Sequence, residues 1–254
     1  MLLVIDIGNT NITIGLYNKQ ELINTYPLTT WFKRTSDEYG FMITHFLQTS
    51  DVLANDIEAV VIASVVPKIM HSFTNSIRRY IHKEPMIVGP GIKTGIAIKM
   101  DNPREMGADR IVDAVGAHYT YGGDILVIDF GTATTFEYIN EKGEYLGGCI
   151  TPGIEISTQA LTSNTAKLPE VEIKAATKIL STNTIAGMQA GIFFGYVGQT
   201  EYIVKKFKEE TGKDLKVIAT GGLGRIISEN TDCIDIYDPE LTFKGLRIIY
   251  EKQS

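Results

Sequence analysis

The sequence predicts an α/β protein built from two related domains, and the main observation is an internal repeat. Residues 3–11 read LVIDIGNTN and residues 126–134 read LVIDFGTAT, 123 residues further along a chain of 254. Each copy starts with apolar β-forming residues, typical of a strand inside a sheet, and ends near a glycine that permits a turn. A repeat at half the chain length indicates duplication of one domain. We therefore expect two lobes, each with a mixed sheet, that face each other across a cleft.

The segments around each repeat have the periodicity of further strands and helices. Alternating residues predict half-buried strands, a continuous β-branched run predicts a central strand, and apolar residues three and four apart predict helices. The first half should contain strands at 12–17, 21–28, 57–66 and 86–88, a helix capped by Ser36 or Asp37, and a helix at 68–80. The second half should contain strands at 135–139 and 217–219 and helices at 154–161 and 184–211. Because residues 89–105 are rich in Gly, Pro and Lys, we place the lobes at 1–105 and 106–254.

Composition limits the classes of function. The net charge is −6 and the pI is about 5.3, which argues against nucleic acid as a partner, since binding to phosphate backbones needs a basic face. The longest apolar stretch, near residues 190–198, is much shorter than the roughly 18 residues that a membrane span needs. The two cysteines are far apart and form no metal or disulfide pattern. We therefore expect a cytoplasmic protein without a membrane or nucleic-acid partner.

The two Asp-x-Gly turns are candidate phosphate sites. In the first, Asp6, Asn9, Thr10 and a series of backbone N–H groups come together where Gly8 lets the chain turn. Amides and hydroxyls suit phosphate oxygens, and a carboxylate suits the accompanying cation. The same residues also form ordinary turns after strands, and the second copy, with Asp129, is what favours a functional site. The sequence has no Walker loop, so any kinase activity must bind phosphate in another way.

A second candidate is the segment Gly107-Ala108-Asp109-Arg110, which opens a helix. Acidic residues are common in the first turn of a helix because they interact favourably with the helix dipole and the unpaired N–H groups. From the residues alone, this structural role explains Asp109 better than catalysis does.

Two glycine patterns remain. Gly187, Gly191 and Gly195 recur every four residues of the helix at 184–211, which permits close approach of another helix at a lobe or dimer interface. The turn at 220–222, Thr-Gly-Gly, follows a strand and suits either an ordinary turn or close contact with a flat adenosine.

Several motifs together resemble one family. They are DIGNT (6–10), NP (102–103), GADR (107–110), DFGTATT (129–135), GGCITPG (147–153), TAKLP (165–169), TGG (220–222) and LTFKGL (241–246). In this order they are similar to the type III pantothenate kinases, within the superfamily of actin, hexokinase and heat-shock-protein-70 ATPases. The resemblance implies a duplicated ribonuclease-H-like, actin-like ATPase fold. It also implies ATP-dependent phosphorylation of the primary hydroxyl of pantothenate to 4'-phosphopantothenate, the first step of coenzyme A biosynthesis, by a homodimer.

The resemblance further assigns roles to residues of this chain. Asp109 would be the catalytic aspartate, and Asp129 would hold a monovalent cation, K⁺ or NH₄⁺. The carboxylate of Asp6 would hold Mg²⁺ through water. The residues expected to bind ATP are Asp6, Ile7, Gly8, Asn9, Thr10, Asn11, Ile12, Thr13 and Thr132. The residues expected to bind pantothenate are Gly107, Ala108, Asp109, Arg110 and Thr184.

Alternatives of other classes stay open. The family resemblance includes an accessory factor linked to transcriptional control, so a non-catalytic regulator is one alternative. Another small-molecule kinase, such as a sugar kinase, is a second, although the short chain and the GADR and TAKLP motifs disfavour it. Met100 stands where many family members have an aromatic residue, so contacts to pantothenate there are expected to differ.

Overall fold

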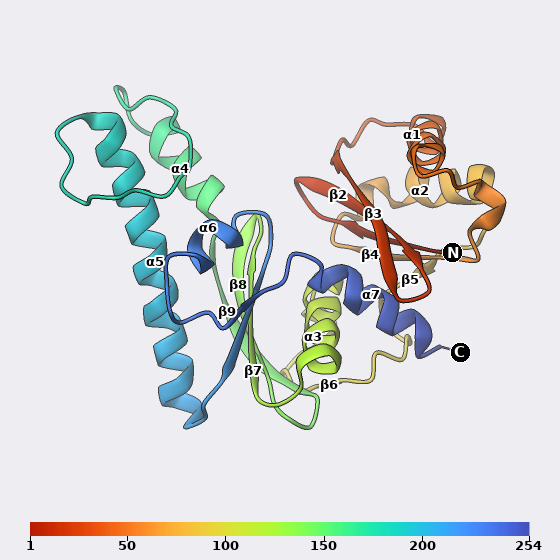
Figure 1. Cartoon of the computed structure of the whole chain (residues 1–254). Coiled ribbons are helices and arrows are strands. Elements are labelled where there is room, and N and C mark those ends of the chain that lie inside the picture. The colour runs from red at the N-terminus through yellow and green to blue at the C-terminus, as the bar shows by residue number, and fades with distance from the viewer. Residues whose placement is uncertain (254) are drawn as a thin grey trace. The chain divides into compact units, whose positions relative to one another are not determined.

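The computed structural model describes residues 1–253, which form two compact units (Figure 1). Unit 1 contains residues 1–95, 102–119 and those from Thr242 onward, and unit 2 contains residues 96–101 and 120–241. The chain therefore leaves unit 1, builds unit 2, and returns to unit 1 at its last helix. The division of the sequence at residue 105 remains a prediction about where the duplicated halves join.

Unit 1 is organised around a mixed sheet with the strand order β3-β2-β1-β4-β5. The central strand β1 is antiparallel to β2 and parallel to β4. In this register Asp6 lies opposite Thr13 and beside Ala63, at the end of the sheet where β1 turns into β2. The strands are β1 (Leu2–Ile7), β2 (Asn11–Asn18), β3 (Glu21–Thr29), β4 (Ala59–Ser64) and β5 (Met86–Ile87).

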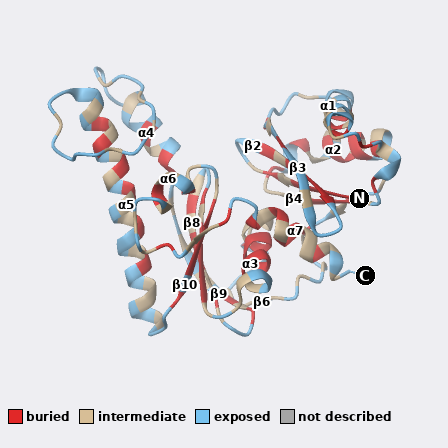
Figure 2. Ribbon diagram, in the orientation of Figure 1, coloured by how far each residue is buried: buried red, intermediate tan, exposed pale blue. Residues whose placement is uncertain are grey.

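Helices cover both faces of this sheet. α1 (Ser36–Thr49) and α2 (Pro67–Ser76) share a core with Leu3, Ile5 and Ile7 on one face. On the other face lies α7 (Leu241–Glu251), because a Cβ added to Gly15 would meet Val4 of β1 at 2.9 Å and Phe243 of α7 at 3.0 Å. In Figure 2 the buried residues of these strands and helices are coloured red.

α3 (Ala108–Tyr121) packs against α7 on that second face. The backbone of Val112 fills the space that a side chain at Gly245 would need, so the two helices approach closely. The hydroxyl of Thr242 also donates to the carboxylate of buried Asp113 at 2.7 Å. The segment with the GADR motif is thereby fixed to unit 1.

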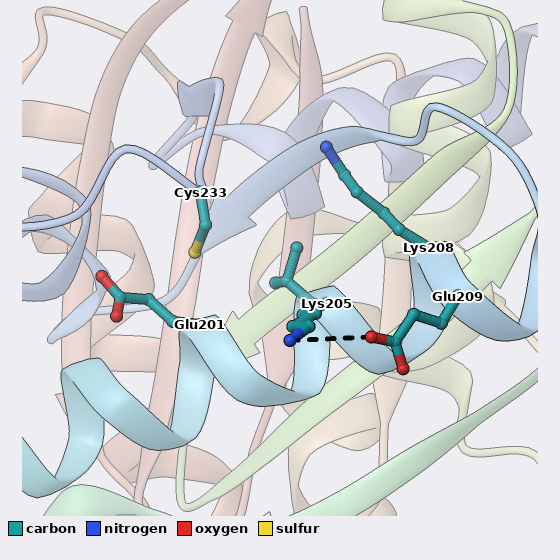
Figure 3. Close-up of a pocket in the computed structure, with 6 residues that line it drawn as sticks. Glu201, Lys205, Lys208, Glu209 and Cys233 are labelled. Atoms are coloured by element: carbon teal, nitrogen blue, oxygen red, sulfur yellow. Dashed lines mark ion pairs between the residues drawn. The ribbon is translucent and has the colours of Figure 1, made fainter.

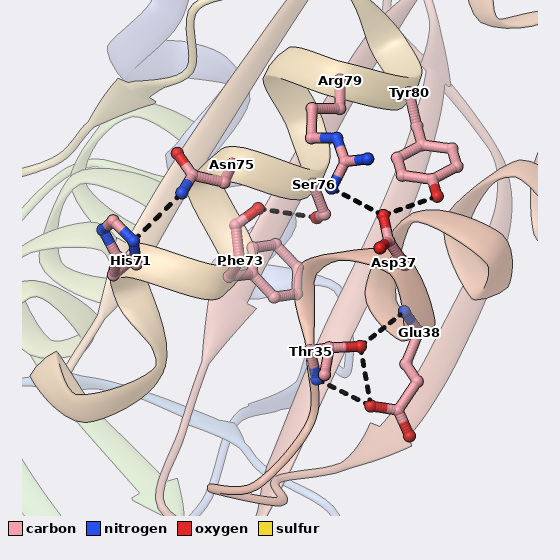
Figure 4. Close-up of polar contacts among 9 residues, drawn as sticks. All are labelled: Thr35, Asp37, Glu38, His71, Phe73, Asn75, Ser76, Arg79 and Tyr80. Carbon is pink, nitrogen blue, oxygen red and sulfur yellow. Dashed lines mark hydrogen bonds and ion pairs between the residues drawn. The ribbon is translucent and has the colours of Figure 1, made fainter.

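The start of α1 differs from the expected one. The cap is Thr35, not Ser36 or Asp37: its hydroxyl accepts from the N–H of Glu38 at 3.3 Å, and the Glu38 carboxylate accepts from the N–H of Thr35 at 2.7 Å (Figure 4). This reciprocal pair is a capping box, and it leaves Asp37 available for the Tyr80 hydroxyl at 2.8 Å and for Arg79 at 2.7 Å. The sequence prediction was wrong by one residue because several adjacent polar residues can each act as a cap.

Three short helical segments complete the described chain of unit 1. They are 3₁₀ turns at Ala54–Asp56 and Pro103–Glu105 and a π-helical turn at Ile77–Ile81, which continues α2. The basic pair in that turn lies on the solvated surface, where Arg78 pairs with Glu84 at 2.6 Å and Arg79 pairs with Asp37.

Unit 2 repeats the sheet of unit 1. Its strand order is β11-β10-β7-β8-β9-β6, and the first five strands match β5-β4-β1-β2-β3 in both order and direction. This correspondence confirms the duplicated fold. The strands are β6 (Ala97–Ile98), β7 (Ile125–Phe130), β8 (Ala133–Ile139), β9 (Glu144–Pro152), β10 (Lys216–Thr220) and β11 (Ile236–Tyr237).

The helices of unit 2 cover one face of its sheet. α4 (Ile154–Ser163), α5 (Thr184–Thr211) and α6 (Gly224–Ser228) share a core with Leu126, Ile128 and Phe130. Asp129 alternates with these residues and therefore points to the opposite face. α5 has the bounds that the sequence predicted. No helix within residues 1–253 has the length and apolar character that crossing a bilayer requires.

Candidate functional site

The first Asp-x-Gly turn places polar residues at the end of the unit 1 sheet. Ile7 and Ile12 are fully buried at the two ends of the turn, whereas Asn9 and Thr10 between them are exposed. The N–H of Gly8 donates to the carbonyl of Asn11 at 2.9 Å, which closes the turn. Of the residues expected to bind ATP, Ile7 and Ile12 therefore have buried side chains, and Asn9 and Thr10 are presented to solvent.

The carbonyl oxygens of this turn are bound to neighbouring segments. The N–H of Val65, just after β4, donates to the carbonyl of Ile7 at 3.1 Å. Thr30, just after β3, donates its N–H to the carbonyl of Thr10 at 2.9 Å and its hydroxyl to the carbonyl of Gly8 at 2.7 Å. An anion is attracted by N–H and hydroxyl donors and repelled by carbonyl oxygens. The carbonyl groups of Ile7, Gly8 and Thr10 are therefore engaged by protein, an arrangement that suits the binding of an anion.

Asp109 lies in the first turn of α3, as the sequence predicted. One of its carboxylate oxygens accepts from the N–H of Arg110 at 2.8 Å. Gly107 has no side chain to displace this carboxylate, because a Cβ there would collide with Asp109 Oδ1. The same Cβ position is 3.5 Å from Cγ1 of Val65, the residue whose N–H binds Ile7.

Val65 therefore binds the first turn and lies next to the GADR segment. Asp6 also points toward the face of the sheet that α3 and α7 cover, because it is two residues after Val4 on the same strand. The structure thus brings together two sets of residues that are about a hundred positions apart in the sequence, Asp6–Thr13 and Gly107–Arg110.

The second turn is built around Asp129 in unit 2. A Cβ at Gly221 would lie 2.6 Å from both Asp129 Oδ1 and the carbonyl oxygen of Phe130, and one at Gly131 would lie 3.2 Å from Asp129 Oδ2. Gly221 also has a φ of +90°, which L residues rarely adopt. The Thr-Gly-Gly turn is thereby packed directly over the Asp129 carboxylate.

Two further contacts fix this arrangement. The Tyr237 hydroxyl donates to the carbonyl of Gly221 at 3.0 Å, and burial raises the pKa of Tyr237, with the charge of Asp129 adding to the effect and that of Arg225 opposing it. The N–H of Gly153 donates to the carbonyl of Thr132 at 3.1 Å. A side chain at Gly153 would collide with that carbonyl, so the GGCITPG motif has a structural function here.

Thr132 and Thr184, the predicted binding residues of unit 2, are exposed. Thr132 follows Gly131 in the second turn, and Thr184 is the first residue of α5, after its cap Asn183. Met100, in the short segment after β6, is half-buried. Thr30 and Val65 also contact the first turn through hydrogen bonds, and no sequence pattern predicted either residue. Neither belongs to a recognised motif, so only the fold could reveal them.

A hollow on α5 is separate from these residues. It has a volume of about 440 Å³ and is lined by Glu201, Lys205, Lys208, Glu209 and Cys233 together with Val204 (Figure 3). Lys205 and Glu209 pair at 3.7 Å, and burial raises the pKa of the Cys233 thiol, which disfavours the reactive thiolate. We interpret this hollow as part of the charged surface of α5. Within residues 1–253, no cluster of three or more His, Cys, Asp or Glu residues is arranged to hold a metal ion.

Similar solved structures define the fold. A protein from Sinorhizobium meliloti described as a 2-dehydro-3-deoxygalactonokinase aligns with a TM-score of 0.63 at 11% identity, over 99% of this chain and 96% of that chain. A Campylobacter jejuni protein described as a Baf family transcriptional activator aligns with a TM-score of 0.62 at 20% identity, over 99% and 98%. Together with the duplicated sheets, these similarities define the ribonuclease-H-like fold shared by actin-like ATPases and sugar kinases.

Sequence comparison defines the family within this class. The model of the type III pantothenate kinase family matches residues 2–206. A relative from Agathobacter rectalis named type III pantothenate kinase is 52% identical over 255 residues, which covers 100% of this chain and 98% of the relative. The chain belongs to the type III pantothenate kinase family, as its motifs predicted.

Proposed function

We propose that this chain transfers a phosphoryl group from ATP to the primary hydroxyl of pantothenate, forming 4'-phosphopantothenate, the first step of coenzyme A biosynthesis. The observation that carries the proposal is the position of Val65, which binds Ile7 of the Asp6 turn and lies next to Gly107 of the Asp109 segment. A carboxylate base and a phosphate-binding turn are the two components that phosphoryl transfer to an alcohol needs. The identity of the substrate, pantothenate, is inferred from membership of the type III pantothenate kinase family.

In this proposal the first turn binds the phosphates of ATP. Asn9 and Thr10, both exposed, donate to phosphate oxygens, and backbone N–H groups of the turn do the same. Asp6 fits Mg²⁺ because Mg²⁺ prefers oxygen ligands and keeps several waters, so a single carboxylate at the edge of the turn is sufficient. The ion, when bound, neutralises charge on the phosphates.

Asp109 is the proposed base. The pantothenate hydroxyl oxygen forms a bond to the γ-phosphorus, the bond from that phosphorus to the bridging oxygen breaks, and ADP leaves. The hydroxyl proton passes to the Asp109 carboxylate. Gly107, Ala108, Arg110 and Thr184 are the proposed pantothenate-binding residues, with the Arg110 guanidinium suited to a carboxylate or phosphate oxygen.

The second turn is the proposed site of a monovalent cation, K⁺ or NH₄⁺. The donor set fits, because the Asp129 carboxylate and the Phe130 carbonyl oxygen both lie next to Gly221. Both are oxygen ligands, and Gly221 and Gly131 leave space around the carboxylate. Thr132 is proposed to bind ATP through its exposed hydroxyl.

The decisive experiment measures ADP release from ATP and Mg²⁺, with and without pantothenate, in K⁺ buffer and then in Na⁺ buffer. We expect turnover that requires both pantothenate and K⁺, with the product gaining one phosphate by mass spectrometry. Folded protein without pantothenate-dependent turnover in any buffer would refute the proposed reaction.

A variant tests the cation site separately. Asp129→Asn should change the dependence of turnover on K⁺ concentration. Asp124→Asn is the matched control, because Asp124 is a carboxylate of the same unit that binds the Tyr138 hydroxyl at 2.7 Å and Lys213 at 3.5 Å. Equal K⁺ dependence in both variants would remove Asp129 from the cation site.

We also propose that the chain forms a homodimer in the cytoplasm through the glycine face of α5. Apart from the adjacent backbone of α5 itself, no described atom of unit 2 lies within 4 Å of a Cβ placed on Gly191 or Gly195, so these glycines are not used for packing within unit 2. Large apolar side chains near the start of α5 are exposed, including Leu180 at 86% and Ile185 at 51%.

Sedimentation velocity tests the dimer. Gly191→Leu should fold normally, since its side chain has open space in one subunit, and should sediment as a monomer. A wild-type chain that sediments as a monomer, or a variant that remains dimeric, would contradict the proposed interface.

A further inference from the structure

Thr30 connects the loop after β3 to the first turn through two hydrogen bonds. Its hydroxyl donates to the carbonyl of Gly8 at 2.7 Å, and its N–H donates to the carbonyl of Thr10 at 2.9 Å. Its exposed fraction is only 8%, so water is not positioned to replace the hydroxyl. One residue thus holds carbonyl groups on both sides of Asn9.

Thr30 is itself held on both sides. The Arg34 guanidinium donates to the carbonyl of Thr29 at 2.8 Å, and the Tyr39 hydroxyl donates to the carbonyl of Trp31 at 3.1 Å. Tyr39 is fully buried in α1 and its ring meets that of Phe73 edge to face at 4.9 Å. The backbone around Thr30 is therefore anchored to the core of unit 1.

These contacts have a specific consequence for an anion. If the carbonyl of Gly8 or Thr10 rotated toward a bound phosphate, it would repel the phosphate oxygens and remove N–H groups from them. A hydrogen bond to each carbonyl prevents that rotation before the ligand arrives, and an organised turn binds more tightly because less ordering is needed.

We propose that Thr30 is a positioning residue for the phosphates of the nucleotide. It acts through Gly8 and Thr10, by holding their carbonyl groups away from the anion, and it does not touch ATP. The inference rests on the proposed function, since it assumes that the first turn binds ATP. It assigns a role to a residue outside the Asp-x-Gly motif.

Trp31 provides a direct readout. It is the sole tryptophan of the chain, it is 57% exposed, and it adjoins Thr30. Nucleotide that binds to the first turn should therefore change tryptophan fluorescence, and titration with Mg²⁺ and ADP should give a dissociation constant without catalysis.

The test compares three variants of the full chain. Thr30→Val keeps the shape and removes the hydroxyl, whereas Thr30→Ser keeps the hydroxyl. Thr74→Val is the matched control, because Thr74 is 7% exposed, belongs to the same unit, and donates its hydroxyl to the carbonyl of Met70 at 2.7 Å. It has the same kind of bond without a link to the first turn.

For Thr30→Val we expect the KM for ATP and the dissociation constant for ADP to rise about three- to tenfold, the range that corresponds to one hydrogen bond. The turn binds phosphate in both the ground state and the transition state, so kcat and the KM for pantothenate should change little. Thr30→Ser should keep wild-type nucleotide binding. Thr74→Val should lower thermal stability without changing nucleotide binding.

The outcomes separate this inference from the proposed function. A wild-type chain that binds no nucleotide would refute the proposed function itself. A wild-type chain that binds ADP, together with unchanged nucleotide binding in folded Thr30→Val, would overturn the role of Thr30 alone. If Thr30→Val does not fold, Tyr39→Phe provides the test, because loss of the bond to Trp31 should weaken ADP binding in the same direction, and unchanged binding would refute the inference.

Discussion

The substitution Asp109→Asn distinguishes a catalytic from a structural carboxylate. The amide oxygen of Asn can still accept the hydrogen bond from the N–H of Arg110, which is 2.8 Å from Asp109 Oδ1 in the structure. The substitution therefore keeps the local bond and removes only the charge and the basic oxygen. If Asp109 merely supports the start of α3, little should change.

The expected magnitudes differ strongly. Loss of a negative charge in the first turn of a helix costs about 0.3–1 kcal/mol of stability. Loss of a general base lowers the rate about 10²- to 10⁴-fold, which corresponds to about 3–5 kcal/mol of activation free energy. A single measurement of kcat therefore separates the two roles.

The assay is pantothenate-dependent ADP release, with unfolding in urea measured on the same samples. Asp113→Asn is the matched control, because Asp113 is one helical turn further along α3, is 4% exposed, and accepts the Thr242 hydroxyl at 2.7 Å. Its loss should cost about 1–3 kcal/mol of stability, since it weakens a buried hydrogen bond, with little change in kcat.

The result that would refute the reasoning is near-normal kcat in Asp109→Asn with a native circular dichroism spectrum. A loss of activity that accompanies an equal loss in Asp113→Asn would also refute it, because both variants would then act through the position of α3.

Three further predictions concern stability. Burial, and to a lesser extent Lys252, lowers the pKa of His118 below its ordinary value of 6.5. The unfolded chain therefore binds a proton at this residue more readily than the folded chain does. The stability due to neutral His118 is fully present above pH 6.5 and is lost as the pH falls below that value. Urea unfolding at several pH values should therefore show a weaker loss toward acid in His118→Gln, and an unchanged slope would contradict this. Gly221→Ala should lower the free energy of unfolding by about 2–4 kcal/mol, because its φ is +90° and its Cβ would be 2.6 Å from Asp129 Oδ1, whereas Gly222→Ala, with no described atom within 4 Å of its Cβ, should cost little. Thr35→Ala should cost about 1 kcal/mol and Ser36→Ala almost nothing, and equal losses in the two would show that Thr35 is not the cap.

The sequence predicted the main architecture because local sequence patterns reveal the duplication. The repeat of LVID with a following glycine predicts two equivalent central strands, and β1 and β7 occupy equivalent places in their sheets. Helix α5 has the predicted bounds, and in the structure a side-chain cap at Asn183 and a left-handed glycine at Gly212 mark its ends. Asp109 was placed correctly at the start of α3.

Other features depend on contacts between distant segments, which no local pattern encodes. Thr30 binds Gly8 across 22 positions, and nothing in the run Thr29-Thr30 distinguishes one threonine from the other. The pairing of Val65 with Ile7, like the packing of Gly221 over Asp129, follows from strand order. The roles of Asp6, Asp129, Thr132 and Thr184 in binding remain predictions.

The return of α7 to unit 1 affects how the chain can fold during synthesis. The β-strands of unit 1 lie within the first 95 residues, yet the helix that places Phe243 next to Gly15 is made almost last. Until then one apolar face of the nascent sheet lacks its final cover, while unit 2 can form from a nearly continuous stretch. Removal of residues after Leu241 should therefore affect unit 1 and its phosphate-binding turn more than unit 2, although the deleted segment follows unit 2 directly in the chain.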